Sequence, residues 1–202
     1  MAKRTGNGWW NFARGVDNWN NAARLKMTHY HVFETNLGFA AIAWGEKGIT
    51  RFRLPFPDRA PVEAQFKGKA TAEAPPSSIA AVVDQAMRYF AGEQIDFSPI
   101  DLDLSGVDRE RRPIYDALRK VKFGETITYG ELAKRAGVTA PQAAQDVGIA
   151  MARNPVPLII PCHRVLAAGG KLGGFSAPGR TETKQKMLAL EGVFIGGQPR
   201  LL

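Results

Sequence analysis

Cysteine and histidine are scarce in this chain, with one cysteine and three histidines among 202 residues. A single cysteine cannot form an intramolecular disulfide or a multi-cysteine zinc site, and three histidines could hold at most a weak metal site. We expect neither metal nor cofactor. No uninterrupted apolar run approaches the roughly 18 residues that cross a bilayer, which excludes a membrane span. The first 26 residues also lack the continuous apolar stretch of a secretory signal. These absences favour a cytoplasmic protein.

Acidic residues are sparse in the second half of the chain. Residues 1–110 carry 13 basic and 13 acidic side chains, so the whole formal charge of +8 belongs to residues 111–202. Such asymmetry indicates a half that binds a polyanion, and nucleic acid is the first candidate. The hydrophobic fraction of 45% and the charged fraction of 23% are typical of globular proteins and argue against wholesale disorder.

The first half of the chain has the pattern of a small sheet and one helix. Residues 28–54 contain three β-rich runs separated by glycine-containing breaks, which predicts a three-stranded meander. The proline- and alanine-rich residues 55–76 are expected to be connection. A helix is predicted from Ser77 or Ser78 to Gly92, with an inner face of Ile79, Val82, Val83, Ala86 and Phe90.

Two polar or irregular segments suggest where the domains divide. Residues 93–108 carry four irregularly spaced aspartates and are expected to form a solvated linker. Residues 1–26 hold Trp9, Trp10 and Trp19 among glycine, asparagine and arginine, which indicates a flexible extension. The predicted organisation is therefore an extension over 1–26, an N-terminal domain over 27–104 and a C-terminal domain over 105–202.

The C-terminal half is predicted to be mostly helical. Pro113 belongs to the first turn of one helix, and a short helix over 129–136 is broken by Gly137. Another begins at Ala140 or Pro141 and ends near Arg153, before Asn154-Pro155. Two helices joined by a short glycine-containing turn are a candidate helix-turn-helix.

The only cysteine follows an extended, proline-bounded segment. After Leu158-Ile159-Ile160 comes Pro161-Cys162-His163-Arg164-Val165, and a glycine-rich loop follows at 169–174. A lone cysteine is most often a small buried hydrophobe. Here an adjacent histidine can serve as base for the thiol, and a nearby base or cation lowers a thiol pKa. Glu182 and Glu191 are the downstream acids available to orient the imidazole.

These segments resemble the O6-alkylguanine-DNA alkyltransferases, also called methylated-DNA–protein-cysteine methyltransferases. The resemblance rests on residues 154–165, on Thr128-Tyr129-Gly130-Glu131-Leu132-Ala133, on Gly173-Gly174-Phe175-Ser176 and on Leu190-Glu191-Gly192. It is strong over about 111–192 and only in outline over 28–104. It implies an α+β fold, with a ribonuclease-H-like N-terminal domain of small antiparallel sheet and helix, and a mostly helical C-terminal domain with a helix-turn-helix.

The resemblance also implies a reaction and a set of roles. Cys162 would accept the alkyl group from O6-alkylguanine in double-stranded DNA, with O4-alkylthymine a second candidate lesion, and each molecule would react once. His163 would act through a water as base, Glu191 would orient it, and Asn154 would brace the bend. Tyr129 would donate a proton or hydrogen bond to guanine N3. The alkylguanine pocket would be formed by Pro157, Phe175, the backbone N–H of Ser176 and carbonyls near Cys162 and Val165.

The DNA contacts implied by the resemblance centre on the second helix of the helix-turn-helix. Its small residues suit close approach to a minor groove, although tight core packing explains Gly148 and Ala150 equally well. Gln145 stands where the family usually has an arginine that fills the vacated base stack, which predicts weaker or slower lesion extrusion. The predicted DNA-binding residues are Thr128, Ala143, Ala144, Gln145, Gly148, Arg153 and Arg164.

Three other interpretations remain open at this point. A relative that binds alkylguanine without repairing it has its acceptor cysteine replaced, whereas Cys162 is present. A helix-turn-helix transcriptional regulator leaves residues 161–165 and Glu191 unexplained, and a thiol hydrolase lacks an oxyanion-hole motif. The cysteines that hold zinc in some family members are absent, and His29 and His31 are interpreted as strand residues. We expect a monomer without an obligate protein partner.

Overall fold

The computed structural model describes residues 28–196, so the predicted extension with its three tryptophans lies outside the described residues. Strands β1 (His29–Thr35), β2 (Gly38–Gly45) and β3 (Gly48–Phe56) form the predicted antiparallel meander. Gly38 and Gly48 have φ angles of +114° and +120° after the two tight turns, a backbone region that glycine enters without strain. A Cβ at Gly38 would also collide with the carbonyl of Phe56. The glycine-containing breaks therefore identify the hairpins correctly.

The expectation that residues 55–76 are plain connection is wrong. Strand β3 continues through Pro55, helix α1 spans Arg59–Ala64, and the two-residue strand β4 (Thr71–Ala72) pairs in parallel with β1. The sheet order is β3-β2-β1-β4, so it is mixed and not purely antiparallel. Proline is tolerated in β3 because this strand lies at an edge of the sheet.

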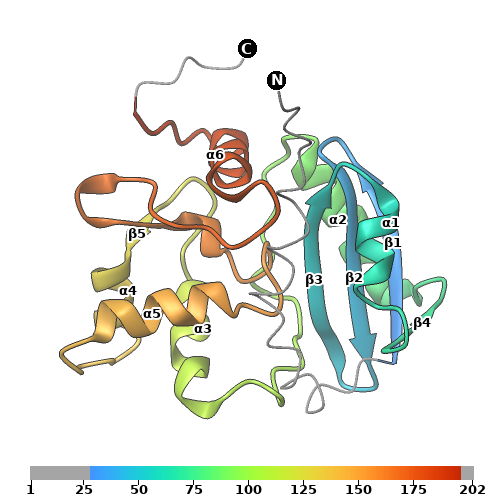
Figure 1. Ribbon diagram of the computed structural model, residues 1–202, viewed down its shortest axis with the longest axis horizontal. Helices are drawn as coiled ribbons and strands as arrows, with labels where there is room; N and C mark the ends of the chain where they lie inside the picture. The colour runs from blue at the N-terminus through green and yellow to red at the C-terminus, as the bar shows by residue number, and fades with distance from the viewer. Residues whose placement is uncertain (1–27, 197–202) are drawn as a thin grey trace, which may run out of the picture.

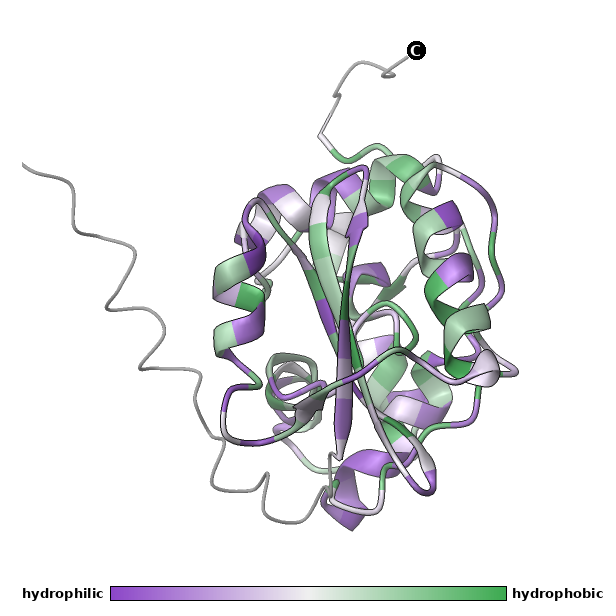
Figure 2. Ribbon diagram, turned by 90° about the vertical axis from the view of Figure 1, so that its right-hand side faces the viewer, coloured by the Kyte–Doolittle hydropathy of each residue, from purple (hydrophilic) through white to green (hydrophobic). Residues whose placement is uncertain are grey.

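Helices cover both faces of this sheet (Figure 1). Helix α2 (Ser77–Phe90) packs its predicted apolar face on one side, and Gly92 follows it with a φ of +96°. On the other side, Val62 of α1 and Phe66 join Val32, Ala41 and Ala43 in a smaller cluster. Figure 2 shows this sheet edge-on between the helices. The central strand β2 is an almost continuous apolar run, as expected for a strand that is buried on both faces.

The segment 93–108 is not the solvated linker that its aspartates suggest. Ile95 and Phe97 are buried, and Leu102 forms an isolated parallel bridge with Ile49 of β3. The buried apolar residues form one cluster that runs from the sheet into the helical half. The two halves of the chain therefore share a core along this segment.

The helical half begins with the 3-10 turn η2 (Arg109–Arg111) and helix α3 (Arg112–Leu118), which has the expected proline in its first turn. Helices α4 (Tyr129–Arg135) and α5 (Ala143–Ala152) follow, and α5 starts two or three residues later than predicted. The remaining elements are β5 (Ile127–Thr128), η3 (Cys162–Arg164), β6 (Val165–Leu166), η4 (Ala168–Gly170) and α6 (Arg180–Leu190). The protein therefore has an α+β architecture.

Two backbone contacts fix the cysteine segment relative to the rest. Strands β5 and β6 pair in parallel, with Ile127 opposite Val165, so the start of α4 lies beside the residues that follow Cys162. The amide of Phe52 on edge strand β3 donates to the carbonyl of Pro155 at 3.1 Å. The segment is thus held between the sheet and the helices. Within residues 28–196, no helix is long and apolar enough to cross a bilayer.

Candidate functional site

Cys162 stands at the end of a tight bend that Asn154 closes. The Asn154 Nδ2 donates to the carbonyl of Ile160 at 2.8 Å, and its Oδ1 accepts from the amide of Val156 at 3.0 Å. Leu158, inside the bend, is buried and has a φ of +80°, a conformation that costs an L-residue free energy. One side chain therefore bridges both ends of a strained bend and sets the direction from which η3 begins.

Cys162 is almost fully buried. The residue is 7% exposed. Burial raises the pKa of the thiol, against the opposing effects of the hydrogen bond with Asn154 and the charge of Lys184. A nearby base was expected to lower the pKa of the thiol. The pKa of Cys162 is raised instead, so there is no thiolate at rest. The thiol is neutral at rest and needs a base during the reaction.

His163 has the geometry of such a base. Its ring is fully buried, and Nε2 lies 2.7 Å from Oε1 of Glu191, which makes Nε2 the protonated nitrogen. Nδ1 has no hydrogen-bond partner among the described residues. Burial lowers the pKa of His163, although the hydrogen bond and charge of Glu191 raise it. A neutral imidazole therefore keeps a free lone pair on Nδ1 in the interior.

The orienting acid is Glu191, the residue that follows α6. Its carboxylate also accepts from the hydroxyl of Tyr89 at 2.8 Å and from the amide of Gly124 at 3.1 Å. Burial opposes the charge of Glu191, but the hydrogen bonds and charges of His163 and Arg164 outweigh it and lower its pKa to about 2. Glu182, the other acid that the sequence offered to orient the imidazole, is exposed and pairs with Lys186. Glu191 is the one that contacts His163.

Arg164 is not placed as a DNA contact, which corrects the sequence prediction. Its Nε and Nη2 donate to the two oxygens of Glu191 at 2.8 and 2.9 Å, and its Nη1 donates to the carbonyl of Val121 at 2.7 Å. The residue is 6% exposed. A guanidinium engaged in this way inside the molecule cannot reach a phosphate, so Arg164 belongs to the buried network of the site.

Lys184 is a member of the site that the sequence analysis missed. Its side chain is fully buried, and Nζ donates to the carbonyls of Val165 and Leu172 at 2.6 Å each. Helical spacing could have predicted that Lys184 is buried. It lies three residues before Met187 and four before Leu188, on the same inward face of α6. This ammonium ties the backbone after Cys162 to the glycine-rich loop. One lone pair of the Val165 carbonyl is already used in this way.

Tyr129 and the glycine-rich loop form the other wall of the site. Tyr129 is the first residue of α4, which a reciprocal capping box between Thr128 and Glu131 initiates. Its hydroxyl lies 3.5 Å from the carbonyl of Gly174. Burial and the charge of a Cys162 thiolate raise the pKa of Tyr129, so the phenol keeps its proton. It is therefore suited to donate that proton.

The predicted pocket residues differ in exposure. Phe175 is half-buried, and its ring centroid lies 6.0 Å from Nζ of Lys184. Ser176 is exposed, with its hydroxyl 3.5 Å from the carbonyl of Ala152. Pro157 is half-buried and Val165 is buried. The bend, the glycine-rich loop and the start of α4 thus contribute to one site.

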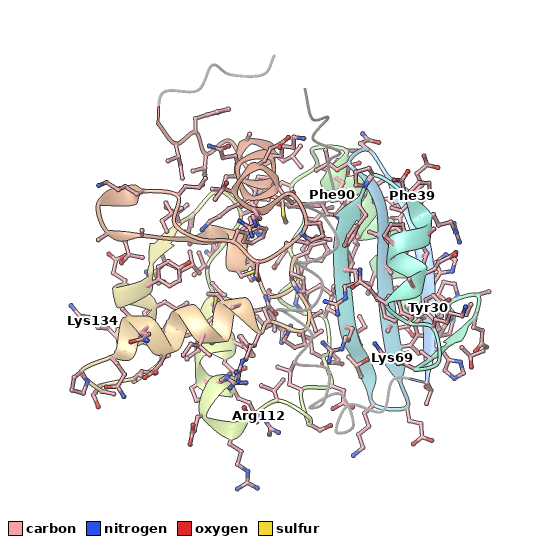
Figure 3. All side chains as sticks on the ribbon, in the orientation of Figure 1. Tyr30, Phe39, Lys69, Phe90, Arg112 and Lys134 are labelled. Atoms are coloured by element: carbon pink, nitrogen blue, oxygen red, sulfur yellow. The ribbon has the colours of Figure 1, made fainter. Side chains whose placement is uncertain are left out.

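Helix α5 presents small and polar residues to solvent, together with the exposed Ile149. Ala144, Gln145 and Arg153 are exposed, whereas Ala143 is half-buried. A Cβ at Gly148 would meet nothing within 4 Å, but Ala150 is fully buried. Core packing therefore explains Ala150 and does not explain Gly148. Figure 3 shows Lys134 of the neighbouring α4 pointing outward, away from the sheet.

Within the described residues, no cluster of three metal-binding side chains occurs. His29 and His31 lie in β1, as predicted, and His29 pairs with Glu73 next to β4.

Comparisons with known proteins agree on one family. Residues 110–193 match a family model described as the DNA-binding domain of 6-O-methylguanine DNA methyltransferase. A methylated-DNA–protein-cysteine methyltransferase of Mycolicibacterium paratuberculosis is 37% identical over 166 residues, which cover 82% of this chain and 93% of the relative. One from Methanothermobacter thermautotrophicus is 34% identical over 78% of this chain and 81% of the relative. Mycobacterium tuberculosis OGT in complex with DNA has a TM-score of 0.65 and 33% identity, covering 82% of this chain and 93% of that structure.

Proposed function

Because the chain belongs to the methylated-DNA–protein-cysteine methyltransferases and so repairs DNA by alkyl transfer to a cysteine, we propose that Cys162 is the acceptor. One observation supports this assignment best. His163, which directly follows the only cysteine, makes a buried hydrogen bond to Glu191. A base held by a carboxylate, with its second nitrogen free, is the arrangement that activates a neutral thiol.

The proposed transfer is an in-line displacement at the alkyl carbon. Nδ1 of His163 takes the thiol proton through a bridging water, while Nε2–H continues to donate its hydrogen bond to Glu191. The sulfur electron pair forms the S–C bond as the bond between carbon and guanine O6 breaks. The resulting thioether has no easy route back, so each molecule reacts once. The depressed pKa of His163 keeps its imidazole neutral and ready to accept the proton.

The leaving guanine is proposed to take its proton from Tyr129. Displacement leaves the electron pair of the broken C–O bond on the base, and a phenol aimed at N3 lets guanine leave neutral. The half-buried position of Tyr129 and its raised pKa support this role, because the proton is retained until negative charge develops on the base.

The alkylguanine is proposed to lie between the bend and the glycine-rich loop. An alkylated oxygen inside a duplex is inaccessible, so the nucleotide must be extruded into a pocket. Pro157 and Phe175 would form the walls, the backbone N–H of Ser176 would reach O6, and carbonyls near Cys162 and Val165 would accept from the exocyclic amine. The second lone pair of the Val165 carbonyl is the one available for this contact.

DNA is proposed to bind along α5, with α4 and α5 acting as a helix-turn-helix that enters the minor groove. The exposed Ala144 and Gln145 and the open position of Gly148 support this placement. Arg153 and the backbone around Thr128 would contact the phosphates on either side. Gln145 would occupy the vacated stack without the positive charge that arginine supplies.

The proposal extends to the fold and the compartment. The sheet with a helix on each face is proposed to be the ribonuclease-H-like domain, divided from the alkyltransferase domain near residue 104. We place the protein in the cytoplasm with its DNA, because a free acceptor thiol must stay reduced.

One labelling experiment tests the acceptor assignment. The protein is incubated with duplex DNA that carries O6-[³H-methyl]guanine, and label on the protein is measured for the wild type and for Cys162→Ala. We expect stoichiometric labelling of the wild type and none of the variant. Transfer that survives the substitution would refute Cys162 as acceptor. Tight lesion binding without transfer would favour a binding-only relative, and preference for an undamaged sequence would favour a regulator.

A further inference from the structure

A tyrosine of the N-terminal half reaches into the buried network of the site. Tyr89, near the end of α2, is fully buried, and its hydroxyl donates to Oε1 of Glu191 at 2.8 Å. The same hydroxyl oxygen lies 3.3 Å from Nε2 of His163. Tyr89 and Glu191 are 102 residues apart in the sequence. The other side chains of the network, those of His163, Arg164 and Glu191, all come from the helical half.

The Tyr89 ring is fixed by aromatic contacts that leave its hydroxyl no freedom to turn away. Phe90, Phe97 and Phe123 each meet the ring edge-on, with centroid separations of 5.2, 5.8 and 6.3 Å. Phe97 belongs to the segment that packs between the two halves. A donor held this firmly defines where Oε1 of Glu191 lies, and that oxygen in turn holds Nε2 of His163.

Tyr89 acts as a neutral donor throughout. Burial, together with the charge and hydrogen bond of Glu191, raises the pKa of Tyr89 well above its usual range, so it does not ionise in the working pH range. Its O–H dipole therefore offsets part of the carboxylate charge that attracts a proton to His163.

We propose that Tyr89 is a positioning residue for alkyl transfer, through which the N-terminal half sets the orientation and basicity of His163. The inference rests on the roles proposed above for His163 and Glu191. It gives the N-terminal half a direct part in the chemistry, because the hydroxyl comes from α2 and the carboxylate from the end of α6.

Removal of the Tyr89 hydroxyl should raise the pKa of His163. Without it, the Glu191 carboxylate is less neutralised and attracts a proton to His163 more strongly, so His163 stays protonated to a higher pH. The charged and titratable groups that face His163 are Glu191, Arg164, Lys184, Cys162 and Tyr89, and only Tyr89 is altered. The acidic limb of the pH–rate profile should therefore move to higher pH.

The test compares two tyrosines that have the same burial and different partners. Tyr89→Phe deletes the hydroxyl of the network, whereas Tyr115→Phe deletes one that donates to the Ala150 carbonyl at 2.8 Å and not to Glu191. Single-turnover transfer from duplex DNA with labelled O6-methylguanine is followed from pH 5.5 to pH 9. Tyr89→Phe should be about tenfold slower at pH 7, equivalent to about 1.4 kcal/mol, with its acidic limb shifted upward. Tyr115→Phe should lose stability but keep the wild-type midpoint.

A second variant keeps the inference testable if Tyr89→Phe does not fold. 3-Fluorotyrosine at position 89 retains the hydroxyl and is a stronger donor, so it should move the acidic limb to lower pH. NMR titration of the His163 ring in DNA-free protein should show the same two directions. An unshifted Tyr89→Phe profile, or an equal shift in Tyr115→Phe, would overturn the inference alone. Wild-type protein that transfers no label would overturn the acceptor assignment and this inference with it.

Discussion

Replacing Arg164 by methionine removes a guanidinium that makes three hydrogen bonds in the interior. Two of them form a fork on Glu191 at 2.8 and 2.9 Å, and the third reaches the Val121 carbonyl at 2.7 Å. Within residues 28–196, the variant leaves the buried Glu191 with Tyr89, His163 and the Gly124 amide as its donors. Removing one partner of a buried ion pair costs about 3–5 kcal/mol, because the other charge stays uncompensated.

The expected result is a folded protein with much lower stability and unchanged DNA contacts. Domains of this size have free energies of unfolding of about 5–15 kcal/mol, so a loss of about 3–5 kcal/mol removes a large part of the stability, and a protein near the middle of that range stays folded. Urea unfolding, followed by the fluorescence of the buried Trp44, measures the loss. Titration of a fluorescent duplex at several salt concentrations measures the number of phosphate contacts from the slope of log Kd against log salt.

Arg153→Met is the matched control, because Arg153 is exposed at the end of α5. It should leave the free energy of unfolding within about 0.5 kcal/mol and reduce the salt slope by about 0.9, the value for one phosphate. Arg164→Met should do the reverse. A salt slope reduced by about one in Arg164→Met would show that Arg164 contacts a phosphate. A stability loss below about 1 kcal/mol would show that its buried pairing with Glu191 is not important for stability.

Three further changes test the DNA surface and the buried lysine. Gly148→Ala should raise the free energy of unfolding by about 0.5–1 kcal/mol, since a helical glycine gains a methyl in open space, yet weaken binding to duplex DNA; equal or tighter binding would argue against α5 in the groove. Gln145→Arg should raise both lesion affinity and the single-turnover rate, and no change in either would refute the weak-extrusion hypothesis. Burial lowers the pKa of Lys184 to about 8 from 10.5. The unfolded state therefore binds more protons between these values, and the free energy of unfolding of the wild type relative to Lys184→Met should rise by up to about 3 kcal/mol from pH 8 to pH 10.5. A flat difference in urea unfolding would show that the ammonium is not desolvated.

Local patterns in the sequence account for the elements that were predicted correctly. The turns of the meander need glycine at positive φ, and α2 shows its buried face directly through helical spacing. Helix α1 was missed because prolines at 55, 57 and 61 conceal the pair Val62 and Phe66, which are four residues apart on one face. Ile95 and Phe97 were missed because the neighbouring aspartates make their segment look solvated. In both cases polar or helix-breaking neighbours outweighed two apolar residues that decide the packing.

In the site too, contacts between residues close in the sequence were predicted, and contacts between distant residues were missed. Cys162 and His163 are adjacent, and the bend at Asn154 is closed by residues within six positions of it, so the sequence indicates this part correctly. Arg164 was assigned to DNA because a cation beside an active cysteine gives no sign of its partner 27 residues away. Tyr89 had no signal, since an apolar helix face predicts a buried ring but not the acceptor of its hydroxyl. Such contacts become visible only when the two halves are brought together.

The neutral state of the resting thiol follows from this arrangement and suits a protein that reacts once. A thiolate is the form that reacts with soluble oxidants and electrophiles, and burial keeps the Cys162 pKa raised. Any adventitious alkylation would consume the molecule, since the thioether cannot be reversed. In the proposed mechanism the base is instead His163, whose free nitrogen is kept neutral by burial and whose other nitrogen donates to Glu191. The proton then leaves the sulfur only when an alkyl carbon is positioned to receive the electron pair, so the same burial that weakens the nucleophile at rest protects it for its one substrate.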